Sequence, residues 1–192
     1  MTEIEWAENI KELINSFLHN TNFVATTASK LIYANEIVKY SGEGNSAEPE
    51  YNAMSYETDI LIRENLSQLE WIPRVVIETK IDSVTTHDAI TYSNKSKAHK
   101  SVHPFLRYGI FIGNHSNKQI PGRLIRHGED FDFMMASAGY ELNIIEQKTL
   151  RKIIELEINA SQSLTNLVFN TRAKDRHRAF ALHRPLVIYD TH

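Results

Sequence analysis

Arg-Val-Val-Ile-Glu-Thr-Lys-Ile, residues 74–81, is the stretch of the sequence that says most about the fold. Its apolar and β-branched residues predict a buried strand. Because side chains alternate across a strand, Glu78 and Lys80 lie on one face of it, ~6–7 Å apart, and Thr79 lies on the other. The stretch therefore predicts a buried strand that ends in a pair of charged groups.

A second strand is predicted just before this one, over residues 56–63, where the apolar run Ile60-Leu61-Ile62 follows Asp59. Residues 64–73 are long enough for the turn or loop that joins two adjacent antiparallel strands. Such pairing can bring the Asp59 carboxylate beside Glu78 and Lys80. The two strands together predict a site with two carboxylates and one ammonium group.

The rest of the chain adds helices and further strands around this pair. The expected elements are a helix over 3–19, a strand within 30–40, a loop over 41–52, a helix over 83–102, strands over 107–113 and 131–137, helical sequence over 142–167 and a short strand over 186–189. This order predicts an α/β three-layer sandwich, with a mixed central β-sheet flanked by helices. A chain of 192 residues suits one domain, with a core over about 1–140 and a C-terminal helical extension over about 141–192.

Composition narrows the class of protein. The sequence contains no cysteine, which excludes disulfides, cysteine-ligated zinc and iron–sulfur clusters. Its apolar runs are too short to cross a bilayer, and the acidic N-terminus lacks the features of a signal peptide. We therefore expect a cytoplasmic protein with no membrane partner.

Charge is distributed unevenly between the two halves of the chain. Residues 1–90 hold 6 Lys/Arg and 15 Asp/Glu, a net charge of −9, whereas residues 91–192 hold 15 and 9, a net charge of +6. No acidic residue occurs from Ala89 to Gly128, and a second basic cluster spans residues 172–178. The pattern predicts a polyanionic partner, although a basic face without a partner is the alternative. The expected contacts with such a partner are Lys95, Lys97, His99, Lys100, Arg107, Arg123 and Arg126, with Tyr92, Lys95 and His99 on one face of the second helix.

The paired carboxylates indicate a chemistry for such a partner. Mg²⁺ takes one or two carboxylates, together with waters and substrate phosphate oxygens, as its ligands. Asp59 and Glu78, with the backbone carbonyl of Thr79, form such a ligand set. A metal held there can activate water for phosphodiester hydrolysis, while Lys80 orients or deprotonates the water or neutralises developing charge.

These residues resemble the PD-(D/E)xK nuclease superfamily, which includes most type II restriction endonucleases. The resemblance covers roughly residues 1–113, with Asp59 followed by an apolar strand carrying Glu78-Thr79-Lys80. It departs from the motif where Thr58 replaces the proline. The resemblance implies an αβββαβ core, Mg²⁺ as cofactor, and Asp59, Glu78 and Lys80 as catalytic residues. It also implies double-stranded DNA as the partner of the basic residues above, and we expect a homodimer, because cutting two strands requires two active sites.

Several alternatives stay open at this point. Glu78 and Lys80 could form a surface ion pair, and Glu146-Gln147-Lys148 repeats the Glu-x-Lys pattern inside a predicted helix. Glu8 or Glu12 of the first helix could be an accessory ligand. His99 with His103 gives only a weak zinc pattern, and Asn114-His115 only a weak HNH-nuclease pattern. The competing functions are a structure-selective repair, recombination or phage nuclease and a non-catalytic DNA-binding subunit with the same fold.

Overall fold

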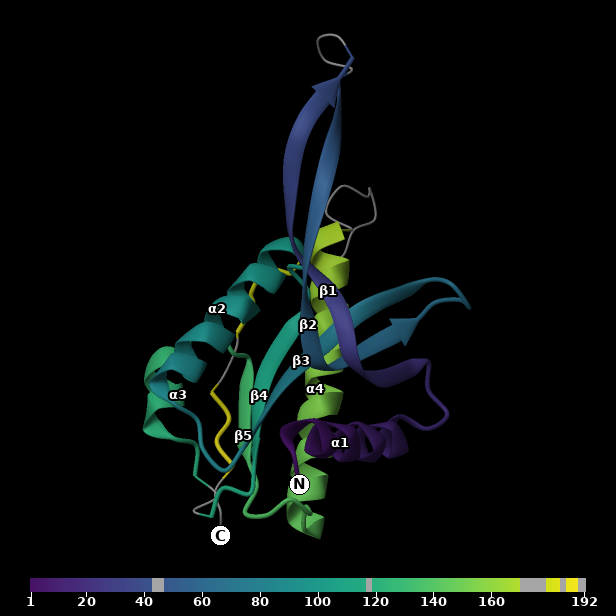
Figure 1. Ribbon diagram of the computed structural model, residues 1–192. Helices are drawn as coiled ribbons and strands as arrows, with labels where there is room; N and C mark the ends of the chain where they lie inside the picture. The colour runs from purple at the N-terminus through teal and green to yellow at the C-terminus, as the bar shows by residue number, and fades with distance from the viewer. Residues whose placement is uncertain (43–46, 117–118, 170–178, 184–185, 190–192) are drawn as a thin grey trace.

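A five-stranded mixed sheet, in the order β1-β2-β3-β4-β5, forms the centre of the molecule (Figure 1). The computed structural model describes residues 1–42, 47–116, 119–169, 179–183 and 186–189. Pairing is antiparallel between β1 and β2 and between β2 and β3, and parallel from β3 to β4 and from β4 to β5. The strands are β1 (Phe23–Ser41), β2 (Glu48–Asn65), β3 (Trp71–Ile81), β4 (Arg107–Gly113) and β5 (Phe133–Ala136).

Helices cover both faces of this sheet. On one face, α1 (Glu3–Leu18) and α4 (Ile144–Phe169) share a core with Ile77 of β3, through residues such as Trp6 and Ile154. On the other, α2 (Thr86–Val102) and α3 (Gly122–His127) pack Ala89 and Leu124 against β4. The predicted three-layer α/β sandwich is therefore present. Because α4 belongs to the first core, the expected boundary near residue 140 falls inside that core.

The helix that follows β3 begins at a well-defined cap. The Thr85 side chain accepts from the Asp88 backbone N–H, and the Asp88 carboxylate accepts from the Thr85 backbone N–H, which satisfies two amides that the helix leaves free. This capping box starts α2 five residues after β3 ends. The helix connects the parallel strands β3 and β4 and packs against β1, and its residue Lys95 reaches Glu78 near the end of β3.

Most of the expected helices and strands are present, but their first and last residues differ from those predicted. The helix over 3–19 and the strand over 107–113 are confirmed almost to the residue. The expected loop over 41–52 is wrong in its second half, because β2 begins at Glu48 and pairs with the far end of β1. The strand expected over 186–189 is also wrong, since these residues are irregular and exposed. The short helix α3 was not expected.

The outer halves of β1 and β2 form a two-stranded ribbon that projects from the body (Figure 1). Residues 35–41 and 50–53 are exposed throughout. Three glutamates, Glu36, Glu48 and Glu50, outnumber Lys39, which pairs with Glu50 at 3.0 Å. Acidic side chains repel phosphates, so the ribbon does not supply the basic surface expected for DNA. Over the part of the chain described, no helix has the length and apolar character needed to span a membrane.

Gly113, at the end of β4, provides a test of how tightly α1 is packed on the sheet. A Cβ atom added there would overlap the indole ring of Trp6, which is completely buried. We expect Gly113→Ala to lower the free energy of unfolding by about 1–3 kcal/mol, as overpacking does. Gly122→Ala is the control, because its Cβ would meet nothing closer than 3.6 Å. Urea denaturation measures both, and equal stability of the two variants would contradict this packing.

Candidate active site

Asp59 of β2 lies beside the charged end of β3. The antiparallel register pairs Leu61 with Val76 and Ile60 with Ile77, so the next step along the strands brings Asp59 to Glu78. The Asp59 carboxylate oxygen Oδ2 accepts two hydrogen bonds from Thr79, from the backbone N–H at 2.7 Å and from the hydroxyl at 3.0 Å. These bonds fix one carboxylate of the expected pair in position.

The backbone opposite Asp59 is irregular. Residues Thr27 and Ser29 of β1 pair with Ile60 and Thr58, whereas Ala28 between them adopts the left-handed conformation, with φ at 50°. A non-glycine residue in that region carries a conformational cost, and such costs concentrate at functional sites. The distortion therefore marks this position of the sheet as unusual, independently of the carboxylates.

Glu78 is completely buried between the sheet and α2. Its Oε1 atom lies 2.8 Å from the Lys95 ammonium and also accepts a hydrogen bond from the Tyr108 hydroxyl. Its Oε2 atom is buried and has no hydrogen-bond partner among the described residues. A buried carboxylate oxygen left without a partner is costly, so its presence requires an explanation.

Burial also changes the protonation of this group. It raises the pKa of Glu78 to about 7, against the opposing effect of Lys95, and the nearby negative charge of Asp59 raises it further. Tyr108 lowers the pKa by its hydrogen bond to the carboxylate. Glu78 is thus a carboxyl group close to half-ionised near neutral pH, which is a common property of functional sites.

Lys80 lies at the same end of β3 but contacts other groups. Its ammonium is 3.0 Å from Oε1 of Glu3 and 5.2 Å from the centre of the Tyr92 ring. Burial by itself would lower the pKa of Lys80, but the contacts with Tyr92 and Glu3 outweigh it and raise the pKa. Lys80 therefore stays protonated, which suits the neutralisation of charge better than the removal of a proton.

The first helix contributes Glu3 to this region. Of the two residues considered as accessory ligands, Glu8 bonds the Thr27 hydroxyl and pairs with Lys11, and Glu12 pairs with Lys11 as well. The accessory-ligand alternative stays a prediction for both residues. Glu3, in the first turn of α1, contacts Lys80 near the end of β3.

The basic residues expected to contact DNA separate into two groups. Lys97, Arg123 and Arg126 are exposed on α2 and α3. The others are engaged inside the protein: Lys95 with Glu78, Lys100 with Asp132 at 2.8 Å, and Arg107 with Asp132 at 2.8 Å and with Glu157. The second basic cluster, over 172–178, lies outside the described residues.

His99 is a correction to the expected DNA contacts, because its side chain is completely buried. Its Nδ1 atom is 3.2 Å from the Ile32 carbonyl and its ring stacks on Tyr108, with centroids 5.7 Å apart. Burial lowers the pKa of His99 to about 4, so the imidazole is neutral and donates to that carbonyl. The basic helix surface expected from sequence does not include it.

The donor set of the site suits a hard cation better than zinc. Within the described ranges, no three His, Cys, Asp or Glu side chains are grouped to hold a metal. Asp59 and Glu78 provide two carboxylates, and the Oε2 atom of Glu78, which has no hydrogen-bond partner in the described part of the chain, could serve as a ligand. A cation bound here would need water and substrate oxygens to complete its coordination, as Mg²⁺ does. The Thr79 carbonyl stays a prediction as a further ligand.

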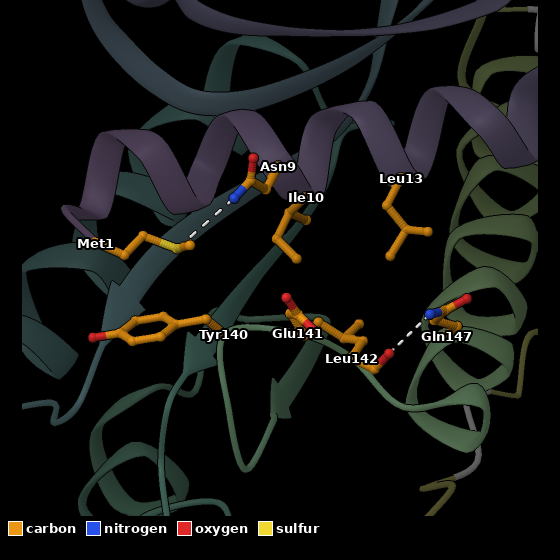
Figure 2. Close-up of a pocket in the computed structure, with 8 residues that line it drawn as sticks. All are labelled: Met1, Asn9, Ile10, Leu13, Tyr140, Glu141, Leu142 and Gln147. Carbon is orange, nitrogen blue, oxygen red and sulfur yellow. Dashed lines mark hydrogen bonds between the residues drawn. The ribbon is translucent and has the colours of Figure 1, made fainter.

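A separate hollow of about 410 Å³ lies between α1 and the start of α4 (Figure 2). Its lining comes from Met1, Asn9, Ile10, Leu13, Tyr140, Glu141, Leu142 and Gln147. Gln147 donates to the Leu142 carbonyl at 2.8 Å, and Asn9 contacts the Met1 sulfur at 3.8 Å. One charged side chain lines the hollow, and the two amides already make these contacts. The hollow therefore lacks a pair of carboxylates like Asp59 and Glu78.

Sequence reasoning missed Tyr108 and Glu3 as members of the site. It predicted Lys95 as a DNA contact on the second helix and not as a partner of Glu78. A signal for Tyr108 existed, because a tyrosine in a buried strand needs a hydrogen-bond partner for its hydroxyl. The parallel register of β3 and β4, which pairs Val76 with Tyr108, was not readable from the sequence. Neither a scan against protein-family models nor a search of the curated proteins finds a match to this chain.

The buried histidine gives a pH-dependent prediction. The folded pKa of His99 is about 4 and its ordinary value is 6.5, so the unfolded chain takes up the proton first. This group therefore stabilises the fold above about pH 6.5 and loses that contribution, up to about 3 kcal/mol, as pH falls towards 4. Relative to His99→Phe, the wild-type protein should lose stability over this window, as measured by denaturant unfolding at several pH values.

The difference in stability between the wild-type protein and the His99→Phe variant reports the contribution of His99. Glu78 has the opposite sign, because its raised pKa makes the folded state less stable as pH rises from about 4.5 to 7. That contribution is common to both proteins. A wild-type-minus-variant difference that does not change with pH would show that His99 is not buried in its neutral form.

Proposed function

We propose that this protein is a Mg²⁺-dependent DNA endonuclease of the type II restriction kind, which hydrolyses phosphodiester bonds at the Asp59–Glu78 pair. The observation that carries the proposal is the buried Glu78 carboxylate, which stands beside Asp59 with one oxygen unsatisfied among the described residues. Two carboxylates that approach each other in a low-dielectric site repel one another. A divalent cation would remove that repulsion and satisfy the free oxygen.

The chain's own residues have separate tasks in this proposal. Thr79 holds Asp59 through two hydrogen bonds, and Tyr108 holds Glu78 through one. Lys80, protonated and next to the pair on β3, would neutralise negative charge that develops on the phosphate. Asp59 and Glu78 would hold Mg²⁺, which when bound would activate the attacking water and stabilise the leaving oxygen.

The position of the exposed basic residues supports DNA as the substrate. Lys97 on α2 and Arg123 and Arg126 on α3 belong to the helical layer that also covers Glu78. The two helices are neighbours in the fold (Figure 1). Cations on this layer can contact phosphates without any sequence preference, whereas base readout requires further contacts in a groove.

Cleavage of DNA by the Glu78→Gln variant is the direct test. Glutamine has the shape of glutamate but removes the negative charge that would bind the cation. We expect Mg²⁺-dependent cleavage to fall at least ~100-fold, since a metal ligand accounts for several kcal/mol of transition-state stabilisation. Plasmid and phage DNA, together with flap and junction substrates, are incubated with Mg²⁺ and analysed on gels.

Glu155→Gln serves as the matched control, because Glu155 is half-exposed and, among the described residues, pairs with Arg151 of the same helix, α4. Glu146 of the second Glu-x-Lys sequence is less suitable, since its carboxylate accepts from the backbone N–H groups of Ala138 and Asn143. Discrete plasmid fragments would support a restriction enzyme, and a preference for branched DNA the structure-selective alternative. Absence of cleavage by the wild-type protein on every substrate would favour a non-catalytic subunit.

A further inference from the structure

The cation that faces the buried carboxylate is Lys95 of α2, and not Lys80 of the Glu-x-Lys motif. The Lys95 ammonium is 2.8 Å from Glu78 Oε1 and 2.7 Å from the backbone carbonyl of Glu57. Its side chain is only 16% exposed, and the rings of Tyr56 and Tyr92 are each 5.9 Å away. This ammonium is therefore enclosed, with acceptors and aromatic faces around it.

Lys95 contacts one oxygen of the Glu78 carboxylate, Oε1, and among the described residues the other oxygen, Oε2, has no hydrogen-bond partner. A divalent ion that uses Glu78 must approach the carboxylate that Lys95 already contacts. A divalent ion and the Lys95 ammonium on the same carboxylate repel each other strongly, because water is largely excluded there. Lys80 does not compete in this way, because its ammonium is held by Glu3 and Tyr92.

We propose that Lys95 is the exchange partner of the divalent cation: its ammonium compensates Glu78 when the metal is absent and leaves Glu78 when the metal binds. The inference rests on the proposed function and names a part of that site which the Glu-x-Lys motif does not contain. Lysine is suited to the exchange, because its charge sits on a flexible four-carbon chain. Asp59, held twice by Thr79, is the fixed side of the site.

A permanent structural ion pair is the competing interpretation, and the two differ in what happens when metal is added. In a permanent pair, Lys95 stays against Glu78 at any metal concentration. In the exchange, the ammonium becomes accessible as the cation takes its place. The chemical reactivity of the Lys95 amine reports this directly, without reference to DNA cleavage.

Trace acetylation of the full-length wild-type protein, with and without saturating Mg²⁺, tests the proposal. The modification of each lysine is quantified by mass spectrometry in mildly alkaline buffer, and saturation is established by calorimetry. We expect labelling of Lys95 to rise several-fold with Mg²⁺, while Lys97, exposed on the same helix, stays unchanged. Unchanged or reduced labelling of Lys95 at saturating Mg²⁺ would overturn the exchange.

A variant gives a second, independent measurement. Lys95→Met keeps much of the side-chain volume and removes the competing charge, so Mg²⁺ should raise its melting temperature more than it raises that of wild type. Lys152→Met, at an exposed position of α4, should respond as wild type does. An equal Mg²⁺ shift in all three proteins would contradict the exchange.

The outcomes also distinguish this inference from the proposed function. If calorimetry detects no Mg²⁺ binding to the wild-type protein and no DNA is cut, both fail together. If Mg²⁺ binds and DNA is cut while Lys95 keeps its reactivity, only the exchange is wrong, and Lys95 is a structural partner of Glu78.

Discussion

Burial of the Glu78 carboxylate is the constraint around which this site is organised. Removing a carboxylate from water costs several kcal/mol unless charge and hydrogen bonds compensate it. Two groups contribute to that compensation, the Lys95 ammonium from α2 and the Tyr108 hydroxyl from β4, whereas Asp59, which Thr79 holds in place, adds a second negative charge. The compensation is incomplete in the described structure, because one carboxylate oxygen is left unsatisfied.

The topology of the sheet brings these contributions together. The antiparallel pairing of β2 and β3 brings Asp59 to the end of β3, and α2, the crossover between the parallel strands β3 and β4, carries Lys95 over the same end. The charged end of β3 is thus enclosed by its two neighbours in the sheet and by the helix that follows it. In the proposed endonuclease, this enclosure provides a partly dehydrated site in which a metal ion acts strongly.

The sequence predicted β3 and its charged end well, because strand alternation and apolar runs are local properties. It predicted the surface much less well. The segment from Ala89 to Gly128 has no acidic residue, yet Lys95, Lys100 and Arg107 find Glu78, Asp132 and Glu157, which lie before or after it in the chain. The charge of a surface depends on which residues tertiary structure brings together. The acid-free segment therefore predicted more exposed basic side chains than the folded protein has there. The sequence predicted a loop over part of the ribbon of β1 and β2, because the polar residues there are typical of a loop.

Calorimetric titration of the metal-free protein with Mg²⁺, in the absence of DNA, tests the central claim most directly. Wild-type protein and the Glu155→Gln control should bind one ion per site, whereas Asp59→Asn and Glu78→Gln should each lose most of that affinity. Parallel thermal unfolding shows that the variants are folded. Equal Mg²⁺ affinity in all four proteins would contradict the account, because the buried carboxylate pair would then not be a metal site.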